Sequence, residues 1–271
     1  MKHIYLNASE IAGLIGKNPY KEQNECIHNV LCRIKKEKNM VDVDKFNIIK
    51  IDELKELIKT FSKEELITKE SSEILKKSLL EKPESKSEIS KKLFELASAD
   101  SINEKNTNNI EKKQKKLEEK LNSIVKTGNK ELIKDYVGGY INKERGTKNE
   151  KKIIKDYEKI TKSQITNNND CLYKVKLFDV GDCMIFICGK IDGIRGDTLI
   201  EIKNRRNRLF TFIPEYEKIQ IEIYLRLTGL EKCKLVQNYN EEQSSFDYVK
   251  DEKLWSVIKS GIKEVSENYL V

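Results

Sequence analysis

The sequence predicts a mixed α/β fold, in which helices cover both faces of a mixed sheet, joined to a long charged helical segment. Two observations predict it. Residues 145–270 alternate between helical periodicity and short β-branched or aromatic runs, in the order helix, three strands, helix, strand, helix. Residues 25–140 instead carry apolar residues at helical spacing on a charged background.

The first predicted element is a short helix within "LNASEIAGLIGKNPY". Asn7 is a good N-cap residue, and Glu10 lies three positions later, which is a variant of the capping box. Gly16 and Pro19 end the helix, because glycine favours the C-terminal cap and proline cannot continue a helix.

Residues 25–140 are predicted to be a helical insertion, with linkers at 82–90 and 99–109. We interpret its Lys/Glu runs as solvated helix faces rather than DNA contacts. The predicted domains are therefore 1–24, 25–140 and 141–271, with the first and third forming one core.

The remaining elements follow from periodicity and turn signals. "DVGD" and "GIRGD" separate three strands, and one helix begins at Pro214 and ends at Gly229. The predicted elements are a helix at 145–161, strands at 171–178, 183–192 and 197–204, a helix at 214–230, a strand at 232–239 and a helix at 251–270.

Composition limits the class of protein. The net charge is +7, from 52 basic and 45 acidic side chains, which permits a polyanionic partner without requiring one. No apolar run is long enough to span a membrane, and the N-terminus lacks the apolar region of a signal peptide, so we expect an intracellular, cytoplasmic protein with no membrane partner. We therefore expect the six cysteines to be reduced.

The segment "GKIDGIRGDTLIEIKNRRNR", residues 189–208, holds the candidate chemistry. In the strand "LIEIKN", Glu201 and Lys203 project from one face and Ile200 and Ile202 from the other. Asp192 comes from the end of the preceding strand and can meet Glu201 and Lys203 across the hairpin. An ordinary salt bridge in an exposed hairpin is the alternative.

A divalent cation would explain this cluster. Two carboxylates buried together are costly without a compensating charge, and Mg²⁺ prefers one or two carboxylates with water and phosphate oxygens. Lys203 would then hold or deprotonate the attacking water and stabilise charge on a phosphate. Residues 190–208 carry six basic and three acidic side chains, which suits a phosphodiester substrate.

With these residues, the sequence resembles the PD-(D/E)xK nuclease superfamily, and within it the lambda exonuclease and YqaJ-like viral recombinase branch. Four segments carry the resemblance in order: "NASEIAGLIGKNPYK", "RGTKNEKKIIKDYE", "GKIDG…LIEIKNR" and "YEKIQIEIYLRLTG". The resemblance implies a restriction-endonuclease-like fold, with a mixed central sheet flanked by helices and a large helical insertion.

The resemblance also implies roles for individual residues. Asp192, Glu201 and the backbone carbonyl of Ile202 would bind Mg²⁺ or Mn²⁺, with Glu150 as a further carboxylate, and Lys203 would be the catalytic lysine. Gln220 would orient Lys203 or the water. The residues that bind DNA would be Ser9, Asn7 and the arginines Arg205, Arg206 and Arg208. Which of the three arginines contacts a phosphate stays open.

The implied function is a metal-dependent DNA exonuclease of the lambda exonuclease type that acts on linear duplex, and as an open alternative on single strands, in viral recombination, repair or defence. It would release 5′-phosphorylated products. A structure-specific or nicking endonuclease, and a DNA-binding recombination scaffold with a vestigial site, are the alternatives. A homodimer or homotrimer stays open. Some relatives hold an iron–sulfur cluster, but only Cys233 follows the catalytic segment, so we expect none.

Overall fold

The computed structural model describes residues 2–36, 49–125, 130–166, 171–205, 207–240 and 242–271. The chain forms two compact units. The first comprises Met1–Val41 and Glu150–Val271, and the second comprises Asp42–Asn149. The compact units divide after residues 41 and 149. The domain boundaries expected from the sequence, after residues 24 and 140, stay a prediction.

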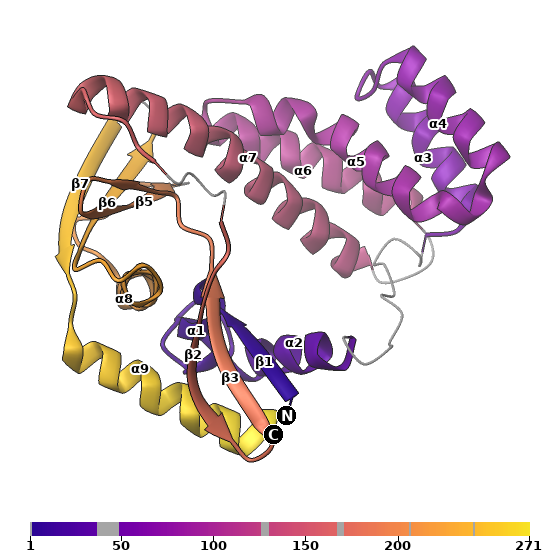
Figure 1. Ribbon diagram of the computed structural model, residues 1–271. Coiled ribbons are helices and arrows are strands. Elements are labelled where there is room, and N and C mark those ends of the chain that lie inside the picture. The colour runs from indigo at the N-terminus through magenta and orange to yellow at the C-terminus, as the bar shows by residue number, and fades with distance from the viewer. Residues whose placement is uncertain (1, 37–48, 126–129, 167–170, 206, 241) are drawn as a thin grey trace. The chain divides into compact units, whose positions relative to one another are not determined.

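The described strands of the first unit form two mixed sheets (Figure 1). One sheet has the order β1-β3-β2, with β1 parallel and β2 antiparallel to β3. The other has the order β4-β5-β6-β7, with β5 parallel to β6. The strands are β1 (Lys2–Asn7), β2 (Tyr173–Val180), β3 (Cys183–Gly189), β4 (Gly193–Arg195), β5 (Thr198–Asn204), β6 (Lys232–Tyr239) and β7 (Glu242–Val249).

Helices of the first unit pack on these sheets. α8 (Glu215–Thr228) contacts β2 and β3 of one sheet and β5 and β6 of the other, so it lies in the centre of the core. It follows Pro214 and ends at Gly229, whose φ of 73° is the left-handed conformation that glycine adopts easily. The other helices of this unit include α1 (Ala8–Leu14), α2 (Gln23–Lys36) and α9 (Glu252–Val265). The predicted mixed α/β class, with helices flanking mixed sheets, is confirmed.

The two faces of β5 differ as the sequence predicts. Ile200 and Ile202 pack against Ile153, Ile154 and Tyr157 near the end of α7 (Lys130–Thr161). Leu199, on the opposite face, belongs to the larger core around α8. Glu201 and Lys203 share the face of Leu199, so the strand directs both side chains toward α8.

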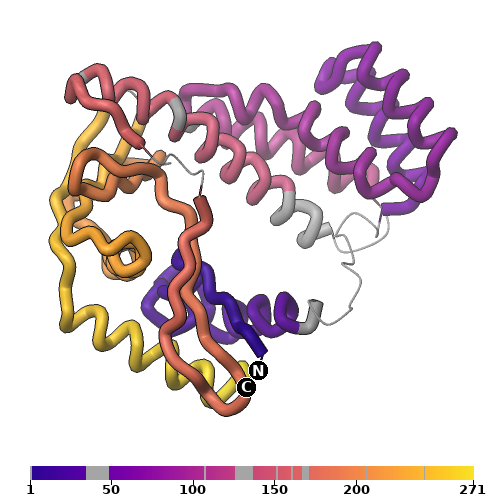
Figure 2. The backbone as a smooth tube through the Cα atoms, viewed as in Figure 1, coloured from indigo at the N-terminus to yellow at the C-terminus, as the bar shows by residue number. Residues whose placement is uncertain are grey.

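The chain leaves one sheet and enters the other just before the candidate site. β3 ends at Gly189, and β4 begins at Gly193. Figure 2 shows the course of the backbone through the orange part of the chain that holds these strands. A Cβ at Gly189 would lie 2.7 Å from a ring carbon of Tyr224 and 3.2 Å from the Cβ of Ala8. The backbone therefore approaches α8 more closely than a residue with a side chain would allow.

Three strands were missed or misread. Neither β1 nor β7 is predicted from the sequence, and β4 lies in the stretch interpreted as a turn. β1 is short and precedes a strong helix signal, while β7 reads "EQSSFDYV" and alternates too weakly to indicate a strand. Both depend on pairing with strands distant in the sequence, β3 for β1 and the antiparallel neighbour β6 for β7.

The second unit is helical. Its apolar core is lined by residues such as Leu57, Phe61, Leu93 and Phe94. Its described helices are α3 (Ile51–Lys63), α4 (Lys69–Glu81), α5 (Lys86–Asn103) and α6 (Thr107–Ile124), with a short 3-10 turn at Pro83–Ser85 and the first part of α7.

The predicted linkers at 82–90 and 99–109 are wrong over most of their length. α5 occupies Lys86–Asn103, and α6 begins at Thr107. Some of the polar residues that suggested linkers, such as Glu88 and Asp100, are exposed on α5, while Ser90 and Ser101 are buried within the second unit. Its Ile89 and Ala97 face the core, so burial of one helix face outweighs the weak local propensity.

Candidate active site

Asp192 lies where the chain crosses between the two sheets, and a backbone hydrogen bond fixes it there. The N–H of Ile202 donates to Asp192 Oδ2 at 2.6 Å. Gly193 pairs with Ile200 in the antiparallel ladder between β4 and β5. The residue before Gly193, Asp192, therefore lies opposite the residue after Ile200, Glu201. The structure thus places Asp192 beside the Glu-x-Lys pair across the hairpin, and its role as a site residue stays a prediction.

Glu201 and Lys203 form a buried ion pair on the face of β5 that looks toward α8. Lys203 Nζ donates to Glu201 Oε1 at 2.6 Å. The Glu201 side chain is 2% exposed, while that of Lys203 is 23% exposed. The lysine therefore contacts an almost fully buried carboxylate, while part of its own side chain stays accessible to a ligand. An exposed hairpin salt bridge, the alternative interpretation, does not describe this pair.

α8 supplies the next contacts. Gln220 Oε1 accepts a second hydrogen bond from Lys203 Nζ at 3.1 Å, as its predicted orienting role requires. Gln220 Nε2 in turn donates to the Tyr224 hydroxyl at 3.0 Å. Tyr224 lies within the segment "YEKIQIEIYLRLTG", four positions after Gln220, but no role is predicted for it from the sequence. The signal was available, because residues four apart on a helix are neighbours on one face.

The acidic groups of the site hold protons unusually tightly. Burial, together with the charge of Glu150, raises the pKa of Asp192 to about 7. Burial and the Asp192 charge raise the pKa of Glu201 to about 7. Burial alone would lower the pKa of Lys203, but the Glu201 and Asp192 carboxylates outweigh it and raise this pKa above its ordinary value. Lys203 is therefore a cation at neutral pH.

Glu150, near the end of α7, reaches the same cluster. Its carboxyl shares a side-chain hydrogen bond with Asp192 and raises the pKa of that residue. Two carboxyls can share a hydrogen bond only when one holds a proton, so the pair is a strained arrangement in the absence of a cation. The structure thus brings together Glu150, Asp192, Glu201, Lys203 and Gln220, all predicted from the sequence.

The donor set fits a small divalent cation. Glu201 Oε2 is buried and has no hydrogen-bond partner among the described residues, which is costly for a carboxylate oxygen. The N–H and C=O of one strand residue leave on the same side, so the Ile202 carbonyl faces the side of Asp192. Within the part of the chain described, no three His, Cys, Asp or Glu side chains form a metal-binding group. Two carboxylates and a carbonyl leave positions for water and phosphate, as Mg²⁺ prefers.

The predicted DNA contacts near the N-terminus lie at the start of α1, with Asn7 as its N-cap and Ser9 in its first turn. The Asn7 N–H donates to Glu10 Oε1 at 2.8 Å, which is one half of the predicted capping box. The Asn7 side-chain oxygen accepts from Cys188 Sγ at 3.4 Å. Ser9 is exposed in the first turn. Phosphate binding by Asn7 and Ser9 stays a prediction.

The three predicted arginines differ in their surroundings. Arg205 is 9% exposed in its side chain, and its guanidinium forms a two-pronged ion pair with Glu217. Its Nε also donates to Gln237 Oε1 at 2.8 Å, so this arrangement does not favour a DNA contact by Arg205. Arg208 is exposed. Arg206 lies outside the described residues.

Two other expectations concern cysteines and membranes. Each of the six cysteines is a free thiol, and Cys183, Cys188 and Cys233 are buried. Burial raises the pKa of Cys188 and of Cys233, as expected for thiols that act as small core residues. The absence of an iron–sulfur cluster stays a prediction. Among the described helices, none has the length and apolar character required to cross a bilayer.

Comparisons with known proteins give weak likenesses. No protein-family model matches the sequence, and no curated protein matches it. The crystal structure of the protein SSO0001 is 19% identical, with a TM-score of 0.38, over 49% of this chain and 62% of that one. This chain therefore spans less than two thirds of that protein.

Two further solved structures are exonucleases. An alkaline exonuclease from Laribacter hongkongensis is 17% identical, with a TM-score of 0.36, over 47% of this chain and 70% of that one. A phage-related exonuclease from Haemophilus somnus 129PT is 12% identical, with a TM-score of 0.35, over 45% and 68%. At such TM-scores the likenesses carry no argument, and the geometry of the site has to support any function.

Proposed function

We propose that this chain is a DNA nuclease that hydrolyses phosphodiester bonds with Mg²⁺ or Mn²⁺. One observation carries the proposal: Asp192 and Glu201, both with a pKa raised to about 7, converge beside a protonated lysine, and one buried oxygen of Glu201 has no hydrogen-bond partner among the described residues. Such a site lacks positive charge. A divalent cation and a phosphate together would complete it.

Asp192, Glu201 and the Ile202 carbonyl would hold the ion, and Glu150 would accept a hydrogen bond from a neighbouring water. When bound, the ion would supply positive charge against the phosphate and lower the pKa of water. Lys203 remains protonated and donates to a phosphate oxygen, which stabilises the charge that develops during hydrolysis. Gln220 holds Lys203 Nζ from the side of α8, so the lysine is oriented before DNA binds.

We propose an exonuclease of linear DNA rather than a structure-specific endonuclease, with 5′-phosphorylated products and a role in viral recombination, repair or defence. The motif resemblance supports this finer assignment. Closed circular DNA separates the two activities, because an exonuclease needs an end. Cleavage of supercoiled circles at the rate of linear duplex would replace the exonuclease with the endonuclease.

The central experiment is a timed digestion of end-labelled linear duplex, with and without a 5′-phosphate, in Mg²⁺, in Mn²⁺ and in chelator. We expect cleavage with either ion and none in chelator. Asp192→Ala should abolish cleavage and leave DNA binding largely intact. Asp197→Asn is the matched control, because Asp197 lies on the same hairpin with a side chain that is 77% exposed. Undiminished cleavage by Asp192→Ala would remove the assignment.

A further inference from the structure

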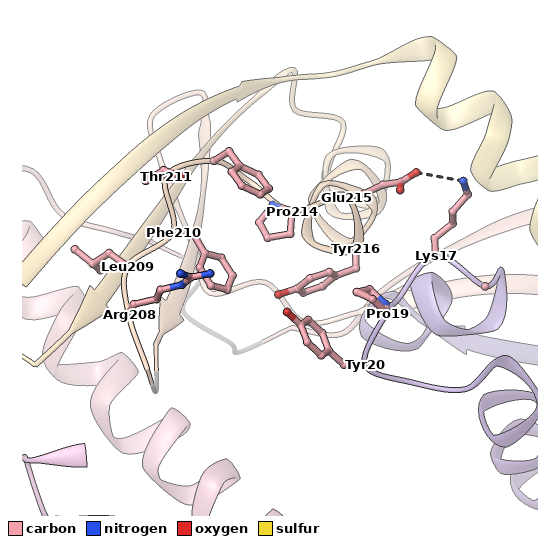
Figure 3. Close-up of a pocket in the computed structure, with 12 residues that line it drawn as sticks. Lys17, Pro19, Tyr20, Arg208, Leu209, Phe210, Thr211, Pro214, Glu215 and Tyr216 are labelled. Carbon is pink, nitrogen blue, oxygen red and sulfur yellow. Dashed lines mark ion pairs between the residues drawn. The ribbon is translucent and has the colours of Figure 1, made fainter. Parts of the chain in front are cut away.

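A pocket of about 750 Å³ lies within the first unit, outside the cluster of candidate site residues. Two segments line it: the turn that follows α1, including Lys17 and Tyr20, and the stretch from Arg208 to Tyr216 that leads into α8. Figure 3 shows Tyr20 and Tyr216 side by side, and Arg208 beside Phe210. Its volume is in the range of pockets that hold small organic ligands.

Four aromatic rings line the pocket, and two of them are open to solvent. Tyr20 is 77% exposed and Phe212 is 67% exposed. Tyr20 meets Tyr216 edge to face, with ring centroids 5.8 Å apart. Phe210 has the Arg205 guanidinium 4.1 Å from its ring centre, so one of its faces is covered. Open aromatic rings gathered in one hollow are typical of a site for a flat, aromatic ligand.

The charges of the lining favour a ligand that is also negative. Lys17 and Arg208 are exposed cations, and Glu215 is the acidic residue among the lining residues. Lys17 Nζ lies 3.4 Å from Glu215 Oε1, with both side chains well exposed to solvent. Arg208 therefore adds a positive charge at the edge of the pocket. A flat ring attached to a phosphate, as in a nucleotide, matches both features.

The pocket adjoins the candidate site through α8. Tyr216, Gln220 and Tyr224 lie at intervals of four residues, so they share one face of this helix. Tyr216 lines the pocket, and Gln220 holds Lys203. Four residues, or about 6 Å along the helix axis, separate Tyr216 from Gln220. A nucleotide whose phosphate contacts Lys203 would bring its base to the mouth of the pocket.

We propose that this pocket, which we call the Tyr20–Phe212 pocket, holds one unpaired nucleobase of the DNA strand whose phosphate contacts Lys203. The proposal rests on the proposed nuclease function, and it names the form of the substrate. A base inside a duplex cannot enter such a pocket without leaving its neighbours. The site therefore selects single-stranded or frayed ends over paired ones.

Photocrosslinking tests the proposal. Short single strands and duplexes carry 5-iododeoxyuridine at one position at a time, and the full-length protein binds them in chelator, where it cannot cleave. Irradiation joins this base to an aromatic side chain on which it stacks. We expect the crosslink at Tyr20 or Phe212, from one position of the strand, and a stronger yield from single strands than from duplexes. A crosslink only to aromatic residues outside the pocket would overturn the proposal.

Affinity measurements add matched variants. Tyr20→Ala and Phe212→Ala should each weaken binding of single strands roughly tenfold, since stacking of one base on an aromatic ring has about that effect. Tyr20→Phe should retain the affinity, because it keeps the ring. Tyr269→Ala is the control, as Tyr269 is 52% exposed and does not line the pocket. Equal losses in Tyr20→Ala and Tyr269→Ala would refute a stacking role for Tyr20.

A competition arm distinguishes the source of the base. A free deoxynucleoside monophosphate that displaces the crosslink as effectively as an unlabelled strand would show a site for free nucleotides and overturn the DNA assignment. The two proposals can also fail separately. A crosslink in the pocket without cleavage in Mg²⁺ or Mn²⁺ would defeat the nuclease alone. Cleavage with an unchanged affinity in both pocket variants would defeat the pocket alone.

Discussion

Lys203 combines two properties that seldom occur together in a lysine. Its side chain is 23% exposed, yet it donates to a carboxylate that is almost fully buried and to a glutamine. The neighbouring carboxylates raise its pKa despite burial, so it keeps its proton at neutral pH. Its chemistry is therefore that of a fixed cation and hydrogen-bond donor. Proton abstraction from water has to be assigned to another group.

The first prediction concerns this lysine. Lys203→Ala should reduce the rate of cleavage by roughly 10²- to 10³-fold, because the site loses the cation and hydrogen-bond donor that faces the phosphate. Lys203→Arg should restore little, since a planar guanidinium cannot occupy the position of a single ammonium between Glu201 and Gln220. Single-turnover digestion measures the rate. Lys232→Ala, at an exposed lysine on β6, should leave it unchanged. A rate within twofold of wild type in Lys203→Ala would contradict this role.

The second prediction follows from the carboxyl pKa values. Asp192 and Glu201 bind protons at about pH 7 in the folded chain, against ordinary values of 3.8 and 4.5. Between these limits the folded state holds more protons than the unfolded state, so metal-free stability falls as pH rises from about 4 to about 7. Asp192→Asn removes one titrating group. It should therefore be more stable than wild type at pH 8, by on the order of 1–2 kcal/mol, and similar to it at pH 5.

Urea denaturation in chelator measures this difference at the two pH values. Asp197→Asn is again the control, because Asp197 is exposed and its own pKa is lowered by hydrogen bonds from Thr198 and Lys232. A gain for Asp192→Asn that is equal at both pH values would mean that charge repulsion does not cause it.

Some site residues could be found from sequence and others could not. Asp192, Glu201 and Lys203 follow from strand alternation next to a turn, which is a local signal. The engagement of Arg205 could not be predicted, because its partner Glu217 lies on α8 and meets it only after the core has formed. The sequence shows only that the arginines follow the candidate strand. Which of them are exposed, and so able to contact DNA, depends on contacts between elements of the folded chain.

At the scale of elements, α8 organises the first unit. Besides Gln220, it carries Glu222, whose side chain is fully buried. Glu222 accepts hydrogen bonds from Arg226, from the Tyr248 hydroxyl of β7 at 3.0 Å and from the N–H of Asp251 at 3.0 Å, just before α9. One carboxylate thus joins α8 to a strand and to the start of another helix.

The third prediction tests this junction. Glu222→Ala should lower the free energy of unfolding by about 3 kcal/mol, because Arg226 and the Tyr248 hydroxyl lose a buried partner. Glu252→Ala removes a second partner of Arg226. Because the Glu252 side chain is 76% exposed, this change should lower the free energy of unfolding far less than Glu222→Ala. Thermal or urea unfolding measures both. Similar losses in the two variants would contradict a structural role for the buried carboxylate.

The helices and strands that could be predicted are those whose own residues show a clear periodicity or clear start and stop residues. β5 is a β-branched run with strict alternation, and α8 has a proline at its start and a glycine at its end. β1 and β7 need partners distant in the sequence, and α5 is polar enough at both ends to resemble linkers. In β1 and α5, burial of one face after folding supplied the stability that local propensity lacked, while β7 pairs with β6 and has one face only half-buried.

At the scale of the whole molecule, the two compact units have separate apolar cores. One is built around α8 and the sheets, and the other from the helices between α3 and the first part of α7. Separate cores allow separate unfolding. The candidate site belongs to the first unit alone, since Glu150 is the residue at which the chain re-enters it.

The fourth prediction uses this separation. Calorimetry of the full chain should show two unfolding transitions. Mn²⁺ should raise the temperature of one of them, because at a hundred times the dissociation constant the ion adds about 2.7 kcal/mol to the free energy of unfolding of the unit that binds it. Asp192→Ala should keep both transitions and abolish the shift. A single transition would contradict the independence of the two cores. An equal shift of both transitions would place the ion outside the first unit.

The hydrogen bonds of the two carboxylates have a consequence for ion selectivity. Asp192 Oδ2 already accepts from the Ile202 N–H, and Glu201 Oε1 from Lys203. Asp192 also shares a hydrogen bond with Glu150, and Glu201 keeps one buried oxygen without a partner among the described residues, so neither carboxylate is set up for bidentate ligation. A large ion such as Ca²⁺, which takes six to eight oxygens, would find its coordination shell filled chiefly by solvent. Calcium should therefore be held loosely, and it would make a useful non-catalytic substitute when complexes with DNA are trapped.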